Sequence, residues 1–120
     1  MSVDTLTKPK TSAEWLAAAD RVSAEIAADA AHYDTEESFV FGGYKRLKNE
    51  GFFKACVPAE FGGGDIGYAD MCQVIRRLGA SCGSTALAFS MHTHLVATAA
   101  WRWRNQKAPT DGLLKRVAAE

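Results

Sequence analysis

The 120-residue sequence predicts an all-α protein, an up-and-down-like bundle of about five to six helices. Apolar residues recur at helical spacing in several segments, and no segment gives a clear strand pattern. Residues 78–101 contain no lysine, arginine, aspartate or glutamate, which is typical of a helix at the centre of a bundle. Residues 1–10 are polar and are expected to form a disordered lead, so the folded domain is expected to span residues 11–120.

The first helix is expected to begin directly after Thr11. Thr11 and Glu14 have the spacing of a capping box, in which each side chain accepts a hydrogen bond from the other residue's backbone amide. From Trp15 to Ala30 the apolar residues recur at helical spacing. This pattern predicts an amphipathic helix of about four to five turns.

A second, shorter helix is expected after a glycine pair. Gly42 and Gly43 each weaken a continuous helix by about 1 kcal/mol relative to alanine, so a turn is expected there first. The helix itself is predicted from about residue 43 to 48. Gly51 follows it and supplies the left-handed conformation that commonly ends a helix.

Residues 52–64 are expected to be irregular. Val57 precedes a proline and is therefore disfavoured in the helical region, which predicts an extended segment over residues 52–58. Residues 59–64 are expected to form a loop that ends in three glycines. Glycine-rich loops can hold phosphate, but this one lacks the spacing of the known phosphate motifs. A tight turn in which side chains would not fit is the preferred interpretation.

Three more helices are predicted in the remaining sequence. Residues 65–77 return to helical periodicity and end in two arginines, which are favourable at the negative end of a helix dipole. The uncharged segment is predicted to form a helix over residues 84–104, and a last helix is expected from about residue 110 to the terminus.

The uncharged helix has three possible interpretations: a membrane span, a metal site or a buried wall. It is about as long as a bilayer requires, but it carries many serines, threonines and histidines and has no second span to pair with. His92 and His94 point to nearly opposite sides of a helix, so they cannot hold one metal ion together. A helix wheel divides the segment into two faces, one with Leu87, Ser90, Met91 and His94, the other with Thr85, Phe89, His92 and Val96.

Overall composition gives no support for several classes of partner. Fourteen basic residues balance fourteen acidic ones, which gives no reason to expect nucleic acid or an anionic membrane. Trp101 to Arg104 could stack on nucleic acid, but a helix end with two indoles that close the core is the preferred interpretation. Cys56, Cys72 and Cys82 show no disulfide or zinc spacing and are expected to be reduced, partly buried thiols in a cytoplasmic protein.

Several short motifs, in order, carry a resemblance to a known family. They are Gly51-Phe52-Phe53, Val57 to Gly63, Asp70 and Leu78 on one helix, and Ser84 to Phe89 followed by His92. Over about residues 12–104 the chain resembles the N-terminal α-helical domain of the acyl-CoA dehydrogenase family. Asp65 and Cys82 stand where the family usually has a glycine and an aspartate.

The resemblance implies a longer flavoenzyme parent. Family members add a middle β domain, which holds much of the FAD, and a C-terminal helical bundle. A carboxylate from the C-terminal part removes the proton α to the thioester while the β hydride passes to the flavin. The resemblance therefore implies no catalytic residue in this segment, and it assigns no FAD-binding residue here. It also implies an acyl-CoA substrate, an electron-transfer flavoprotein or other acceptor, and a homo-oligomeric parent.

This domain would contribute a wall to the acyl cavity. In the family the long helix after the Ser-Thr element borders that cavity, and the matching residues here are Ala86, Leu87, Ser90, Met91 and His94. A charge there would cost several kcal/mol to desolvate, whereas serine and histidine can stay neutral. The polar character favours a branched, polar or aromatic substrate, or a related flavin monooxygenase on the same fold. A stand-alone helical interaction module is the alternative from a different class.

Overall fold

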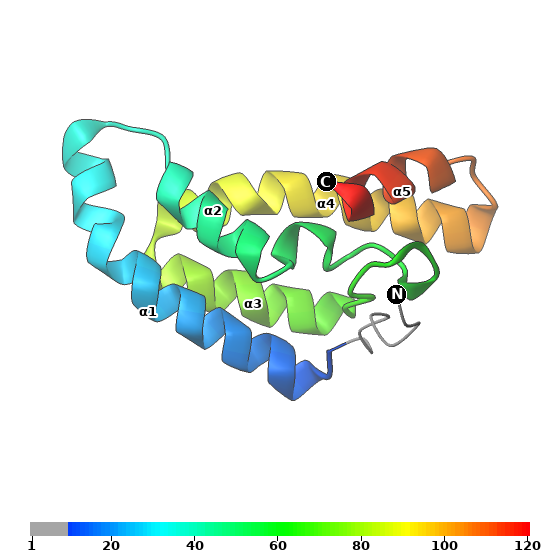
Figure 1. The fold of residues 1–120 in the computed structure, drawn as a ribbon, viewed down its shortest axis with the longest axis horizontal. Helices are drawn as coiled ribbons and strands as arrows, with labels where there is room; N and C mark the ends of the chain where they lie inside the picture. Colours follow the sequence, from blue (N-terminus) through cyan, green and yellow to red (C-terminus); the bar gives the residue numbers. More distant parts are fainter. Residues whose placement is uncertain (1–9) are drawn as a thin grey trace, which may run out of the picture.

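The structure, a computed structural model, describes residues 10–120, and all the regular secondary structure within them is helical. The predicted all-α class is therefore confirmed. The expected lead over residues 1–10 lies outside the described residues except for Lys10. In chain order the elements are α1 (Ser12–Glu36), α2 (Phe41–Asn49), η2 (Phe52–Lys54), η3 (Ala59–Phe61), α3 (Tyr68–Ser81), α4 (Gly83–Gln106) and α5 (Asp111–Ala119). Figure 1 shows α3 running alongside α1, with α2 above them and α5 against the second half of α4.

Helix α1 begins at the predicted capping box but is longer than predicted. The Thr11 Oγ1 atom accepts from the Glu14 amide at 3.2 Å, and Glu14 Oε1 accepts from the Thr11 amide at 3.3 Å. The helix then runs for 25 residues and ends where Glu37 adopts a left-handed conformation with φ of 51°. The extra turns place Tyr33 against Gly42 at the start of α2. This contact with α2 stabilises the part of the helix that continues past the amphipathic pattern.

Helix α2 includes both glycines of the pair, so it begins at Phe41 and not at about residue 43, and the loop expected before it lies at residues 37–40 and not at the glycines. A Cβ atom on Gly42 would collide with the Tyr33 hydroxyl, and one on Gly43 would lie 2.7 Å from Thr85 Oγ1. The glycines let α2 approach α1 and α4 closely, and this packing offsets their weak helix propensity. Gly51 has φ of 80°, as expected for the residue that ends the helix.

The segment after Gly51 is compact, so the extended conformation predicted for residues 52–58 is wrong. The amides of Ala55 and Val57 donate to the carbonyls of Phe52 and Lys54, each at 3.1 Å, and make successive turns. The loop also folds back on itself through amides of residues 64–66, which donate to carbonyls of residues 54–57 at 2.9 to 3.0 Å. These bonds satisfy the backbone while Phe52 is buried in the core.

The three glycines make a tight turn, as the preferred interpretation expected. Gly62 has φ of 85°, and a Cβ atom on Gly63 would collide with the Val57 backbone. A Cβ atom on Gly64 would collide with the Trp15 ring. Asp65 has φ of 50° and belongs to this loop, which is why α3 begins at Tyr68 and not at residue 65 as predicted.

Two groups of buried side chains form the core. The larger group joins α1, α2, α3 and the first half of α4, with Trp15, Ile26, Leu47, Phe52, Leu78 and Phe89 among its members. The smaller group lies under α5 and consists of Val57, Val96, Ala99, Ala100 and Leu114. Helix α4 contributes to both groups, but only one side of it is buried. Within the described residues, no helix is both long and apolar enough to cross a bilayer.

Candidate functional site

One side of α4 is exposed although the helix is largely apolar. We call this side the open face and define it as Leu87, Met91, His94, Leu95, Thr98 and Trp101. The four large apolar members are 66%, 57%, 62% and 56% exposed, in the order Leu87, Met91, Leu95 and Trp101. Its members follow one another at three- and four-residue spacing, so they form a continuous stripe along the helix.

The structure brings together most of the residues predicted to line a cavity. Leu87, Met91 and His94 lie on the open face, and Ser90 lies half-buried beside them. Ala86 is different, because it is 5% exposed and packs in the core near Gly79 of α3. Consecutive residues of a helix point to different sides, so Ala86 faces the core although the next residue, Leu87, lies on the open face.

Sequence reasoning missed three members of the open face, Leu95, Thr98 and Trp101. Leu95 follows Leu87 and Met91 at four-residue spacing, so the helical period could have identified it. Trp101 was expected to close the core, and this is wrong because the side chain is more than half exposed. Trp103 alone packs inward, with its ring 4.7 Å from that of Phe61.

The polar groups near the open face are already hydrogen-bonded within the helix. Ser90 Oγ donates to the Leu87 carbonyl and Thr98 Oγ1 donates to the His94 carbonyl, each at 2.7 Å. His94 Nδ1 lies 3.3 Å from the Ser90 carbonyl, which can only accept, so this contact favours the tautomer with the proton on Nδ1. In the neutral ring Nε2 is then an acceptor. The open face therefore combines apolar side chains with one outward imidazole nitrogen.

His92 has a structural role on another side of the helix. Its Nε2 atom donates to the Phe53 carbonyl at 2.7 Å, and the two rings lie 5.0 Å apart. This agrees with the interpretation of a hydrogen-bonded histidine in the interior. Within the described residues, no group of three or more histidine, cysteine or acidic side chains could hold a metal ion.

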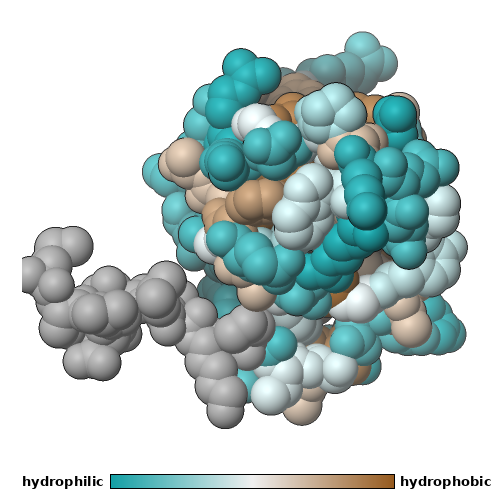
Figure 2. All heavy atoms as spheres, turned by 90° about the vertical axis from the view of Figure 1, so that its right-hand side faces the viewer, coloured by the Kyte–Doolittle hydropathy of each residue, from teal (hydrophilic) through white to brown (hydrophobic). Residues whose placement is uncertain are grey.

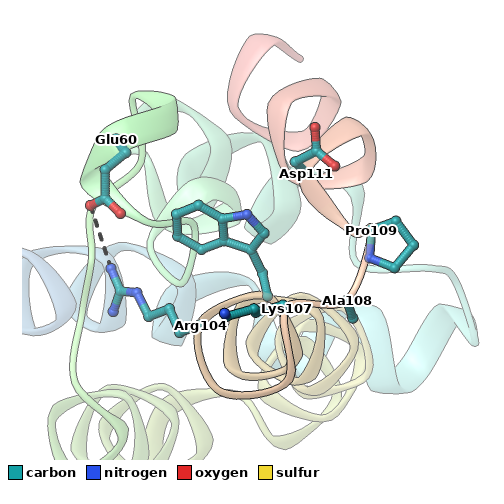
Figure 3. Close-up of a pocket in the computed structure, with 7 residues that line it drawn as sticks. Glu60, Arg104, Lys107, Ala108, Pro109 and Asp111 are labelled. Carbon is teal, nitrogen blue, oxygen red and sulfur yellow. Dashed lines mark ion pairs between the residues drawn. The ribbon is translucent and has the colours of Figure 1, made fainter.

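Two cavities lie elsewhere on the surface. The larger, of about 570 Å³, lies at the junction of α4 and α5, where hydrophilic side chains dominate the surface in Figure 2. In Figure 3 the Arg104 side chain points toward Glu60, with which it forms an ion pair at 3.7 Å. Arg104 also contacts Asp65 at 2.8 Å, so its charge is neutralised. Neither of these cavities includes Leu87, Met91 or His94. All three side chains are exposed, so the described residues do not enclose the open face.

The three cysteines lie in different environments. Burial raises the pKa of the Cys56 thiol to about 11, which keeps it protonated at neutral pH. Cys82 is buried and accepts a hydrogen bond from Thr85 at 3.1 Å. Cys72 is exposed, which differs from the partly buried thiol that was expected.

Comparison with known proteins identifies the helical domain. A model of the family described as "Acyl-CoA dehydrogenase, N-terminal domain" matches residues 14–115, from the first turn of α1 into α5. No curated protein and no solved structure matched the chain.

Proposed function

Because the chain belongs to the family of acyl-CoA dehydrogenase N-terminal domains, we propose that it is the N-terminal part of an FAD-dependent oxidoreductase that dehydrogenates an acyl-CoA thioester. The open face of α4 forms one wall of the cavity for the acyl group, and further polypeptide completes that cavity. In this proposal the chain supplies binding and shape, and it is not catalytic alone.

The observation that carries the proposal is the exposure of apolar side chains along the open face. Leu87, Met91 and Leu95 are each more than half exposed. Burial of a side chain of this kind contributes about 1.5–3 kcal/mol, so the exposed stripe forgoes a large stabilisation. Contiguous apolar surface of this kind is typical of a site that a ligand or another part of the protein covers.

The chemistry of the open face suits an uncharged part of a ligand. The face contains no lysine, arginine, aspartate or glutamate, so covering it leaves no charge unpaired. The Ser90 and Thr98 hydroxyls are already bonded to helix carbonyls, so their desolvation costs little. His94 Nε2 offers one acceptor, which favours a branched, polar or aromatic acyl group over a plain fatty chain.

The described residues fit only a limited contact with FAD. The open face can cover an apolar ring, but apart from His94 it has no basic side chain, and it has no run of free amides to hold a pyrophosphate. We therefore assign the main FAD contacts and the catalytic carboxylate to polypeptide outside this chain. When bound, the flavin supplies the acceptor for the hydride. The open face would orient the acyl group and exclude water from it.

A flavin-dependent monooxygenase on the same fold is the second candidate. It is favoured by His94, because an imidazole on a cavity wall can move protons in oxygen chemistry. The two candidates differ in what they do with acyl-CoA. The dehydrogenase produces a 2,3-unsaturated thioester without oxygen, whereas the monooxygenase consumes oxygen in each turnover.

The remaining features of the parent enzyme are also proposals. We propose that an electron-transfer flavoprotein or another acceptor reoxidises the flavin, and that the parent is a homo-oligomer in the cytoplasm. Sedimentation of the purified parent enzyme tests the oligomeric state. Reoxidation of its reduced flavin by electron-transfer flavoprotein, compared with molecular oxygen, tests the acceptor.

Reading the gene beyond the codon for Glu120 is the first test. Continuation into strand-rich sequence followed by helices supports the flavoenzyme. A stop codon at that point, with a folded product that ignores FAD, would instead support a stand-alone interaction module.

Substitutions in the complete gene product test the wall itself. Ser90→Leu and His94→Leu are expected to change the preference among acyl-CoA thioesters more than they change stability. Conservative changes at Thr85 and His92, which lie off the open face, serve as controls. If the preference moved with Thr85 or His92 and stayed constant for Ser90 and His94, the assigned face would be wrong.

A further inference from the structure

The smaller cavity lies where α4 meets α2, η2 and α5, and we call it the His92 cleft. Its volume is about 390 Å³, and its lining residues are Tyr44, Lys48, Phe53, His92, Val117 and Glu120. None of them belongs to the open face. The volume lies within the range of about 300–1,000 Å³ that is usual for small-molecule sites.

Three rings make a preformed wall in the His92 cleft. The Phe53 ring lies 5.1 Å from that of Tyr44 and 5.0 Å from that of His92, with interplanar angles of 75° and 64°. The hydrogen bond from His92 Nε2 to the Phe53 carbonyl holds the imidazole in place. Edge-to-face contacts of this kind can be extended by one more aromatic ring.

Two hydrogen-bond donors accompany this wall. Within the part of the chain that the structure describes, neither the Tyr44 hydroxyl nor the Lys48 ammonium group has a hydrogen-bond or ion-pair partner. Burial raises the pKa of Tyr44, so its hydroxyl stays protonated and can donate. Glu120 supplies the only acidic side chain of the lining, and no ion pair within the described residues joins it to Lys48.

We infer that the His92 cleft binds a small aromatic monocarboxylate. The ligand ring packs against Phe53 between the rings of Tyr44 and His92, and its carboxylate accepts from Lys48 and from the Tyr44 hydroxyl. A neutral ring would make the same apolar contacts but would gain no charge-assisted hydrogen bond from Lys48. An alkyl chain would fit the space but would lose the edge-to-face contacts. This inference does not depend on the proposed enzymatic function.

Titration of the ¹⁵N-labelled 120-residue chain with phenylacetate tests the inference. We expect amide shifts at Phe53, His92 and Val117, with a dissociation constant in the millimolar range for so small a ligand. Lys48→Gln is expected to weaken binding about two- to fivefold, the usual range for an exposed ion pair. Lys45→Gln is the matched control, because Lys45 is exposed on the same helix and does not line the cleft.

Three further comparisons separate the contribution of the charge from that of the ring. Phenylacetamide has nearly the shape of phenylacetate without the charge. It is expected to bind the wild type more weakly than phenylacetate does, and to bind the wild type and Lys48→Gln with equal affinity. Glu120→Gln removes a like charge and is expected to strengthen phenylacetate binding up to about twofold. Hexanoate is expected to bind more weakly than phenylacetate.

Three results would overturn the inference. The first is the absence of saturable shifts around the cleft. The second is an equal loss of affinity in Lys48→Gln and Lys45→Gln, which would show that the anion follows general surface charge. The third is binding of hexanoate as strong as that of phenylacetate, which would remove the role of the rings. All the substitutions are at exposed residues of a folded chain, so loss of structure does not confuse the readout.

Discussion

The two sides of α4 have similar composition and opposite environments. On the inner side, Thr85, Phe89 and Val96 are almost fully buried, and they pack against α2, η2 and α5 respectively. On the open face, Leu87, Met91 and Leu95 are as apolar but are more than half exposed. The absence of charge along a helix therefore does not distinguish a core helix from one that is half covered. What distinguishes them is which neighbouring helices exist to cover each side.

The largest expected effect is the difference in stability between truncating a buried side chain of α4 and truncating an exposed one. Phe89→Ala removes a fully buried ring that contacts the rings of Phe52 and Phe53, at centroid distances of 6.2 and 5.8 Å. It should lower the free energy of unfolding by about 3–5 kcal/mol. Leu95→Ala on the open face should change it by no more than about 0.5 kcal/mol. Urea unfolding followed by circular dichroism measures both values, and similar losses would mean that the open face is packed in solution.

A second effect tests the close approach of α2 to the inner side. Gly43→Ala places a methyl group too close to Thr85, because the ideal Cβ position lies only 2.7 Å from Oγ1 and 2.9 Å from Cγ2 of that residue. Overpacking of this kind should cost about 1–3 kcal/mol. Combination with Thr85→Ala should recover part of the loss, because that change removes both clashing atoms. A double-mutant cycle with no coupling between the two positions would contradict the close packing.

The two histidines provide a smaller contrast of the same kind. His92→Leu breaks the hydrogen bond to the Phe53 carbonyl and leaves that partly buried acceptor without a partner, which should cost about 1–3 kcal/mol. His94→Leu removes only a contact of 3.3 Å on the exposed side, so stability should change by no more than about 0.5 kcal/mol. Thermal unfolding of both variants under identical conditions is the measurement. Equal destabilisation would contradict the division of roles between the two histidines.

The smallest expected effect on stability concerns polar groups placed on the open face. Met91→Lys should change the free energy of unfolding of the isolated chain by no more than about 0.5 kcal/mol, because the side chain is already exposed. It should nevertheless reduce self-association of the chain at high concentration, since it interrupts the apolar stripe. Analytical ultracentrifugation of the wild type and the variant makes this comparison. A large loss of stability would mean that Met91 is packed, which the structure does not show.

Much of the helical framework could be predicted because its signals are local. The capping box at Thr11 and Glu14, the stop at Gly51 and the break before α5 each depend on a few neighbouring residues. The shared face of Leu87, Met91 and His94 follows from the helical period alone. Their exposure does not follow from the period, because burial depends on what packs against the helix.

The sequence by itself determined the all-α class, the approximate helix positions and the two-sided pattern of α4, since these depend on periodicity and capping. Only the tertiary structure decided that the glycine pair lies inside α2, that residues 52–54 form a 3₁₀ helix, that Ala86 is buried and that Trp101 is exposed. The physical reason is that each of these outcomes is set by contact with residues distant in the chain. Close approach of Tyr33 and Thr85 favours glycine in α2, and backbone bonds from residues 64–66 make the loop compact.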